Sequence, residues 1–325
     1  MARQFVRVRL TRIDTIDLRR FRFDLDLTWT CFFMNSDQAI YGRYGGRDAS
    51  GADSRQSLKG LAFALGKALE AHKAGTARPE PLEGPAFTIR NFKSAGMARG
   101  CVHCHNAKEM RIADAKADGT WRREDIHEYP PPDNLGIVLD VDSGNGVAKV
   151  VKGSAAEAAG IRPGHRVTRL AGHPVASFAD ASFALDNWRS DKPVPVTFVD
   201  GKDAREAMLA VAPGWRKTNI TWRPSLLDML PAVPFRPDEL TARERTDLGI
   251  PADQAAFRQG PRVHSTLAEA GIKAGDIVLA IGDGPIRGSS DDLLGHVRRN
   301  YLKGDTVLVK VSRAGQSITI PIQLK

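Results

Sequence analysis

The stretch SAAEAAGIRPGH, residues 154–165, decides the fold of the C-terminal part of this chain because it recurs as STLAEAGIKAGD, residues 265–276. Each copy predicts a short helix, a glycine turn and an apolar strand, at 167–170 and 277–281. We therefore expect two copies of one folded unit.

The elements around the two copies also match in order. Apolar residues at helical spacing predict helices over 177–188 and 289–300. Alternating segments then predict a hairpin in each copy, from 194–199 through Asp200-Gly201 and from 306–311 through Ala314-Gly315. The same tripeptide precedes each copy, as Leu135-Gly136-Ile137 and as Leu248-Gly249-Ile250.

These residues resemble PDZ domains of the bacterial envelope-protease type, over roughly 130–213 and 238–325. The resemblance implies PDZ-like β-barrels in which the Leu-Gly-Ile tripeptides are peptide-binding. Their backbone N–H groups would bind the C-terminus of a protein or peptide partner, which adds as a strand.

The two copies depart from the family pattern in different ways. His165 stands where the first copy should carry Asp, whereas the second copy lacks an alternating strand after Ile250, because Pro251 intervenes. We therefore expect the first unit to bind peptides and the second to be a packing module.

Cys101-Val102-His103-Cys104-His105 is the strongest chemical motif in the chain. C-x-x-C-H is the attachment pattern of haem c, with Cys101 and Cys104 as thioether sites and His105 as the axial iron ligand. The same thiols could form a redox dithiol, and a zinc site would lack its second half. Haem c is favoured because a dithiol does not require His105. His127, Met110, Met97 and His103 are the candidates for a sixth ligand.

The first 76 residues have the order of a partial thioredoxin-like domain. We expect a strand over 5–10, a hairpin from 30–34 to 39–44, and a helix capped by Asp53 or Ser54 that stops near Gly75. Cys31 lies in an apolar strand, where we expect a buried, inert thiol.

Taken together, these segments resemble the bacterial thioredoxin-like/PDZ domain-containing (seleno)protein family. The match is carried by residues 26–29, 41–45 and 101–105. It implies a missing first strand and redox helix, so Met1 would follow an unread CxxC or CxxU segment. It also implies a protein that works outside the cytoplasm, with an unidentified redox partner.

The composition and the motifs exclude several classes of protein. The chain carries 47 Lys and Arg against 38 Asp and Glu, but the charges are interspersed, so we expect no nucleic-acid partner. No apolar run reaches the ~20 residues of a membrane span, and the N-terminus is not a signal peptide. No hydrolase motif is evident.

The sequence thus predicts a mixed α+β multidomain protein. Its parts are a partial thioredoxin-like domain (1–76), a linker with the CxxCH segment (77–129), a first PDZ domain (130–213), a Pro/Trp connector (214–237) and a PDZ-like domain (238–325). We expect an envelope redox or electron-transfer protein with PDZ docking modules. The alternative is a non-enzymatic PDZ scaffold with a structural thioredoxin-like half.

Overall fold

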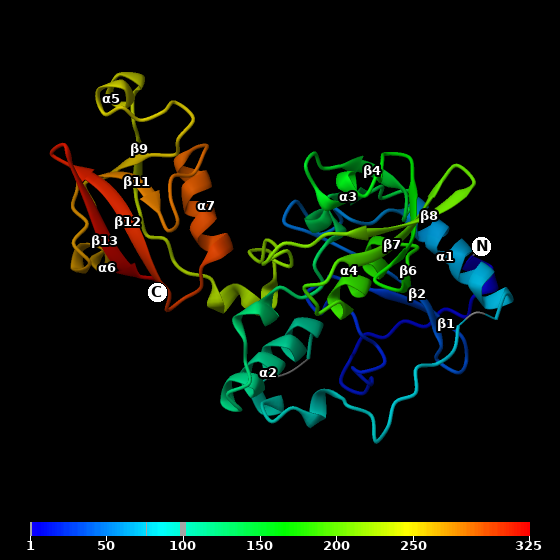
Figure 1. The fold of residues 1–325 in the computed structure, drawn as a ribbon. Helices are drawn as coiled ribbons and strands as arrows, with labels where there is room; N and C mark the ends of the chain where they lie inside the picture. Colours follow the sequence, from blue (N-terminus) through cyan, green and yellow to red (C-terminus); the bar gives the residue numbers. More distant parts are fainter. Residues whose placement is uncertain (1, 76, 98–101) are drawn as a thin grey trace. The chain divides into compact units, whose positions relative to one another are not determined.

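The computed structural model describes residues 2–75, 77–97 and 102–325 and has two compact units, 1–225 and 226–325. Figure 1 traces both units by colour, and each is described here by itself. No helix in the described ranges is long and apolar enough to cross a membrane.

The first unit contains two small sheets and two helices in its PDZ-like part. The sheets pair β3 with β4 and join four further strands in the order β6-β5-β7-β8. The elements are β3 Ile137–Leu139, β4 Val147–Val150, α3 Ala155–Ala158, β5 Arg166–Leu170, β6 His173–Pro174, α4 Phe178–Asn187, β7 Val194–Asp200 and β8 Asp203–Leu209. The predicted helix and hairpin of the first copy are confirmed.

Alternation along β7 builds the core of this part. Val194, Val196 and Phe198 are buried, and they belong to one cluster with Ala184 and Leu185 of α4. Side chains two residues apart on a strand share a face, so β7 presents a continuous apolar surface to the helix.

The sheets in the described residues do not close, so the prediction of a β-barrel is wrong. An isolated bridge between Gly146 and Arg166, with the backbone hydrogen bonds around it, links them.

The N-terminal elements of the first unit form a hairpin and a helix. β1 (Cys31–Met34) pairs with β2 (Ile40–Tyr44), and α1 (Leu58–Lys73) packs against both. Ser57 caps α1 by accepting from the Gly60 N–H, so the predicted cap at residue 53 or 54 is wrong. The helix approaches the end of β3 closely, because a Cβ at Gly60 would lie 2.2 Å from the Val141 carbonyl oxygen.

The strand predicted over residues 5–10 is absent from the structure. Val6, Val8 and Leu10 are 95%, 77% and 61% exposed, and the sheet of β1 and β2 has only two strands. Residues 5–10 alternate in sequence, but they have no partner strand and no apolar surface to pack against. Without these, intrinsic β-propensity does not produce a strand.

The segment after α1 contributes α2 (Cys104–Ala117) and several 3-10 helices. These are Ile89–Asn91, Ala95–Met97, Arg123–Ile126 and Pro132–Leu135 in this region, with Ala2–Gln4 and Pro224–Met229 elsewhere. Ala107 and Met110 of α2 pack against Ile89 and Phe92. Met110 is therefore a core residue.

The second unit is a five-stranded antiparallel sheet in the order β13-β12-β11-β10-β9 with short helices around it. Its elements are β9 Pro237–Glu239, α5 Ala242–Asp247, β10 Phe257–Gln259, α6 Ser265–Glu269, β11 Ile277–Ile281, α7 Ser290–Asn300, β12 Thr306–Arg313 and β13 Gln316–Gln323. Valines and isoleucines of β11 to β13 form the core with Leu293 and Val297 of α7.

The two matched glycine turns use one hydrogen-bond pattern. In the first unit the Arg162 N–H donates to Nδ1 of His165, and in the second the Lys273 N–H donates to the carboxylate of Asp276. His165 thus satisfies the turn in place of the Asp that the family pattern carries.

Candidate functional site

The edge of β3 and the adjoining turn form one side of the candidate site. The 3-10 helix Pro132–Leu135 ends at Gly136, whose φ of 90° is left-handed, and β3 begins at Ile137. A Cβ at residue 136 would lie 2.0 Å from the Ser154 hydroxyl oxygen, so only glycine fits. Within the described residues β3 pairs with β4 alone, which leaves its second edge without a partner strand.

The predicted carboxylate-binding loop is partly occupied by its own turn. The Gly136 N–H donates to the carbonyl groups of Asp133 and Pro132. This amide is therefore not free to bind the end of a peptide in the conformation shown.

A segment from the N-terminal half crosses the same turn. Arg55 lies 2.7 Å from both Asp48 and Asp133, and its guanidinium lies over the ring of Phe178 on α4. The Ser57 hydroxyl donates to the Val141 carbonyl, just beyond β3. Residues 45–57, which we call the cover segment, are thus tied to both sides of the site.

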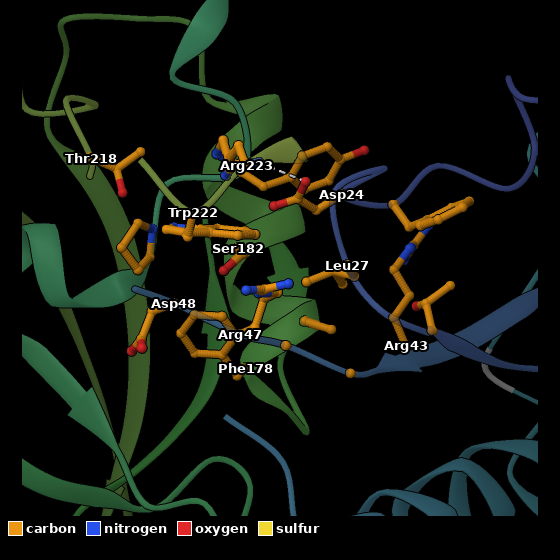
Figure 2. A pocket seen from close by; sticks show the side chains of 17 residues that line it. Asp24, Leu27, Arg43, Arg47, Asp48, Phe178, Ser182, Thr218, Trp222 and Arg223 are labelled. Carbon is orange, nitrogen blue, oxygen red and sulfur yellow. Dashed lines mark hydrogen bonds and ion pairs between the residues drawn. The ribbon is translucent and has the colours of Figure 1, made fainter. Parts of the chain in front are cut away.

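A pocket lies between α4, the cover segment and residues 218–223 (Figure 2). Its cavity volume is about 40 Å³, enough for a few waters or one small polar group. Figure 2 shows the Arg47 side chain reaching between Phe178 and the indole of Trp222. The guanidinium carbon of Arg47 is 5.0 Å from the centre of the indole.

A buried ion cluster supports one wall of this pocket. Arg223, which is 1% exposed, bonds to Asp24 at 2.7 Å and to Asp26 at 3.1 Å. Lys108 of α2 bonds to Asp26 at 2.9 Å, and Glu128 lies 3.6 Å from the same ammonium group. Burial alone would raise the pKa of Asp26, but the charges on Lys108 and Arg223 hold this pKa below its usual range. The cluster fixes residues 222–225 relative to α2.

A second buried carboxylate joins α4 to β2. Asp180 accepts from the N–H groups of Arg43 and Ala176, and one of its carboxylate oxygens lies 3.2 Å from the Ser177 hydroxyl oxygen. Burial raises the pKa of Asp180 to about 6, despite the nearby guanidinium of Arg43. The Ser177 hydroxyl also donates to the Arg43 carbonyl, so β2 is held along the helix.

The tripeptide of the second unit lies in a different place from that of the first. Leu248-Gly249-Ile250 follows α5, and Ile250 packs with Leu240 and Ala256. One edge strand of this sheet is β9, whose Glu239 accepts a hydrogen bond from Ser290 at the start of α7. Leu135-Gly136-Ile137 leads directly into the edge strand β3, whereas no strand begins at Ile250.

The C-x-x-C-H motif is described only in part, because Cys101 lies outside the described residues. Cys104 is a free thiol at the first position of α2, and burial raises its pKa. Nδ1 of His105 donates to Glu109 at 2.8 Å, and the His103 ring stacks on His105. Nε2 of His105 therefore has a fixed direction from which it could bind a metal.

His127 and Cys31 are partly buried. Burial first, and then the charge of Arg223 and its neighbours, lowers the pKa of His127 to about 4. Its Nδ1 accepts from the Thr218 N–H. Burial also raises the pKa of Cys31. Among the residues described, no group of three or more His, Cys, Asp or Glu side chains is placed to hold a metal ion.

Sequence reasoning did not find Arg47, Arg55, Ser182 or the ion cluster around Asp26. Arg47 and Ser182 stand alone in the sequence pattern, whereas Arg55 and Asp26 pair with residues far away in sequence, Asp133 and Arg223. Residues 26–29 and 41–45, which carried the family resemblance, were the available signal, because they adjoin the pocket and the cluster.

Comparisons with known proteins identify the PDZ-like part. Residues 146–199 match the family model described as PDZ domain. No curated protein matches the chain. The solved HtrA-type protease AlgW with decapeptide is similar at 15% sequence identity and a TM-score of 0.24, covering 50% of this chain and 49% of that chain. An AlgW variant with tripeptide gives 12% identity and a TM-score of 0.27, covering 49% and 52%. The chain thus spans about half the length of these structures.

Proposed function

We propose that the first unit is a protein-docking module that binds extended peptide segments at the open edge of β3. The observation that carries this proposal is the unpaired edge of β3 beside α4, within a region that contains the PDZ match. Main-chain hydrogen bonds to a free strand edge give affinity, and neighbouring side chains select the peptide.

The proposal favours the scaffold interpretation over an enzyme. Peptide docking needs only an edge strand and a pocket. We expect affinities of about micromolar, because a few strand hydrogen bonds must offset the lost freedom of the peptide. The second unit is proposed as a packing module, since β9 and α7 are joined by the Glu239–Ser290 bond.

Hydrogen exchange of the full chain tests this function. Addition of short peptides with an apolar C-terminal residue should slow exchange at the amides of β3. The amides of β8, an edge strand of the other sheet, are the internal control and should not change. Binding without protection at β3, or no binding of any such peptide, would contradict the proposal.

A redox or haem c role at Cys101–His105 is a second candidate function. The fixed imidazole of His105 supports it. Cys104 and His105 fit the attachment pattern; when bound, haem would supply electron transfer. The family resemblance and an extracytoplasmic location belong to this proposal.

A further inference from the structure

We propose that the pocket between α4, the cover segment and residues 218–223 binds a carboxylate group through the guanidinium of Arg47 and the hydroxyl of Ser182. Neither residue belongs to the Leu135-Gly136-Ile137 loop. The proposal therefore adds a side-chain site to the docking surface and does not depend on that loop.

Arg47 is a cation without an anion. No carboxylate lies within ion-pair distance of it in the described part of the chain, and its buried Nε has no hydrogen-bond partner. Its side chain is half-buried and its guanidinium lies against the Trp222 indole, so water cannot replace a partner on that face. A buried N–H without an acceptor is unfavourable, and such groups in native proteins usually mark a water or a ligand.

Ser182 is the second unmatched donor. It is 5% exposed, lies on α4 and lines the same pocket, and its hydroxyl has no partner among the described residues. Hydroxyl groups inside helices commonly donate to the carbonyl four residues earlier. Ser182 does not, and its hydroxyl remains available to the pocket that Arg47 enters (Figure 2).

The charges around the pocket favour one monovalent anion. Three arginines and two aspartates line it: Arg43, Arg47, Arg223, Asp24 and Asp48. Asp24 is neutralised by Arg223 at 2.7 Å and Asp48 by Arg55 at 2.7 Å. Asp180 faces Arg43, so Arg47 is the lining arginine that is left without a carboxylate partner among the described residues.

The size and shape of the pocket favour a carboxylate over a phosphate. A cavity of about 40 Å³ accepts one planar three-atom group, whereas a phosphate is larger and carries more than one charge. A guanidinium matches the two oxygens of a carboxylate with parallel hydrogen bonds. The rings of Trp222 and Phe178 exclude water and strengthen these bonds.

The carboxylate could belong to the C-terminus of a docked peptide or to a free small acid. Both present the same chemistry to Arg47 and Ser182. The first source deepens the proposed docking function and rests on it; the second is independent of it.

The test uses the full chain and three probes: acetate at constant ionic strength against chloride, short peptides with an apolar C-terminal residue, and the same peptides amidated. Binding is measured by calorimetry and by tryptophan fluorescence, since Trp222 forms a wall of the pocket. The variants are Arg47→Gln and Ser182→Ala. The control is Arg78→Gln, an exposed arginine away from the pocket.

We expect acetate or the free peptides to bind, and each variant to lose about tenfold in affinity while the control keeps it, because each removes a charge-assisted bond. Weaker binding of the amidated peptides identifies a chain terminus as the source, and binding of acetate alone identifies a free acid. Equal peptide binding by the natural chain and Arg47→Gln would overturn the carboxylate site but leave docking intact. No effect of any carboxylate would show that the pocket holds only water and would also overturn it.

Discussion

The guanidinium of Arg55 lies 2.7 Å from the carboxylate of Asp133, so the cover segment is tied to the turn that precedes β3. This pair stands where the end of a docked peptide would approach. A peptide that uses the turn must therefore compete with a contact inside the chain.

We predict that Arg55→Gln increases peptide affinity. The variant removes both ion pairs of Arg55 and lowers the cost of moving the cover segment by about 1 kcal/mol, which corresponds to about a fivefold gain in affinity. Lys59→Gln is the matched control, because Lys59 pairs with Asp142 at a well-exposed position. Titration with one peptide compares the three proteins, and unchanged or weaker binding by Arg55→Gln would mean that the cover segment does not compete.

We predict opposite stability changes for two buried serines. Ser182→Ala removes an unpaired hydroxyl and should raise the free energy of unfolding by about 1 kcal/mol. Ser225→Ala removes a hydroxyl that donates to Asp26 at 3.0 Å and should lower it by a similar amount. All five tryptophans lie in the first unit, so urea unfolding followed by tryptophan fluorescence reports this unit alone. A loss of stability in Ser182→Ala would show that its hydroxyl has a partner.

We predict that Gly136 is required for the stability of the fold, whatever its role in binding. Gly136→Ala introduces a Cβ at a φ of 90° and 2.0 Å from the Ser154 oxygen, so we expect a loss of more than about 2 kcal/mol. Gly153→Ala is the control, because its φ of 75° is similar but no atom lies within 4 Å. It should lose only about 1 kcal/mol. Equal losses in urea unfolding would mean that Ser154 can move away.

Local pattern explains which parts of the fold could be predicted. Alternation placed β7, and helical spacing placed α4 and α7, because the apolar residues of each element recur at the spacing typical of its type. The strand expected over residues 5–10 is absent, because an alternating pattern does not show whether a partner strand exists. The pocket could not be predicted, since Arg47, Ser182 and Trp222 meet only after distant segments fold together.

The helix α2 shows a similar limit. The sequence pattern did not predict α2, because this helix has low amphipathicity. Its buried side includes Lys108, whose charge is stable there only when it pairs with Asp26. A sequence pattern counts such a lysine as surface. The C-x-x-C-H motif was recognisable, yet its chemistry depends on surroundings that residue spacing does not contain.

We predict that Cys104 reacts slowly with thiol reagents. Burial raises its pKa, so the reactive thiolate is scarce at neutral pH. The rate of iodoacetamide alkylation, followed by peptide mass analysis in a Cys101→Ser variant, should lie below that of free cysteine. Cys31, whose pKa burial also raises, is the internal comparison. Rapid modification of Cys104 alone would instead favour a redox dithiol.

The stability of the first unit should depend on pH through Asp180. Burial raises its pKa from 3.8 to about 6, while Arg43, whose N–H and guanidinium face it, opposes the shift. Because the pKa is higher in the folded state, the stabilising contribution is complete below the unfolded value of 3.8 and is lost as pH rises through about 6. The loss amounts to about 3 kcal/mol.

Comparison with Asp180→Asn isolates this contribution, because the other titrating groups are common to both proteins. The free energy of unfolding of the natural chain minus that of the variant should fall between pH 4 and pH 7 by roughly the amount that the pKa shift implies. Urea unfolding followed by tryptophan fluorescence measures this difference. A difference that is constant or rises with pH would show that the Arg43 and Ala176 N–H groups hold Asp180 ionised throughout.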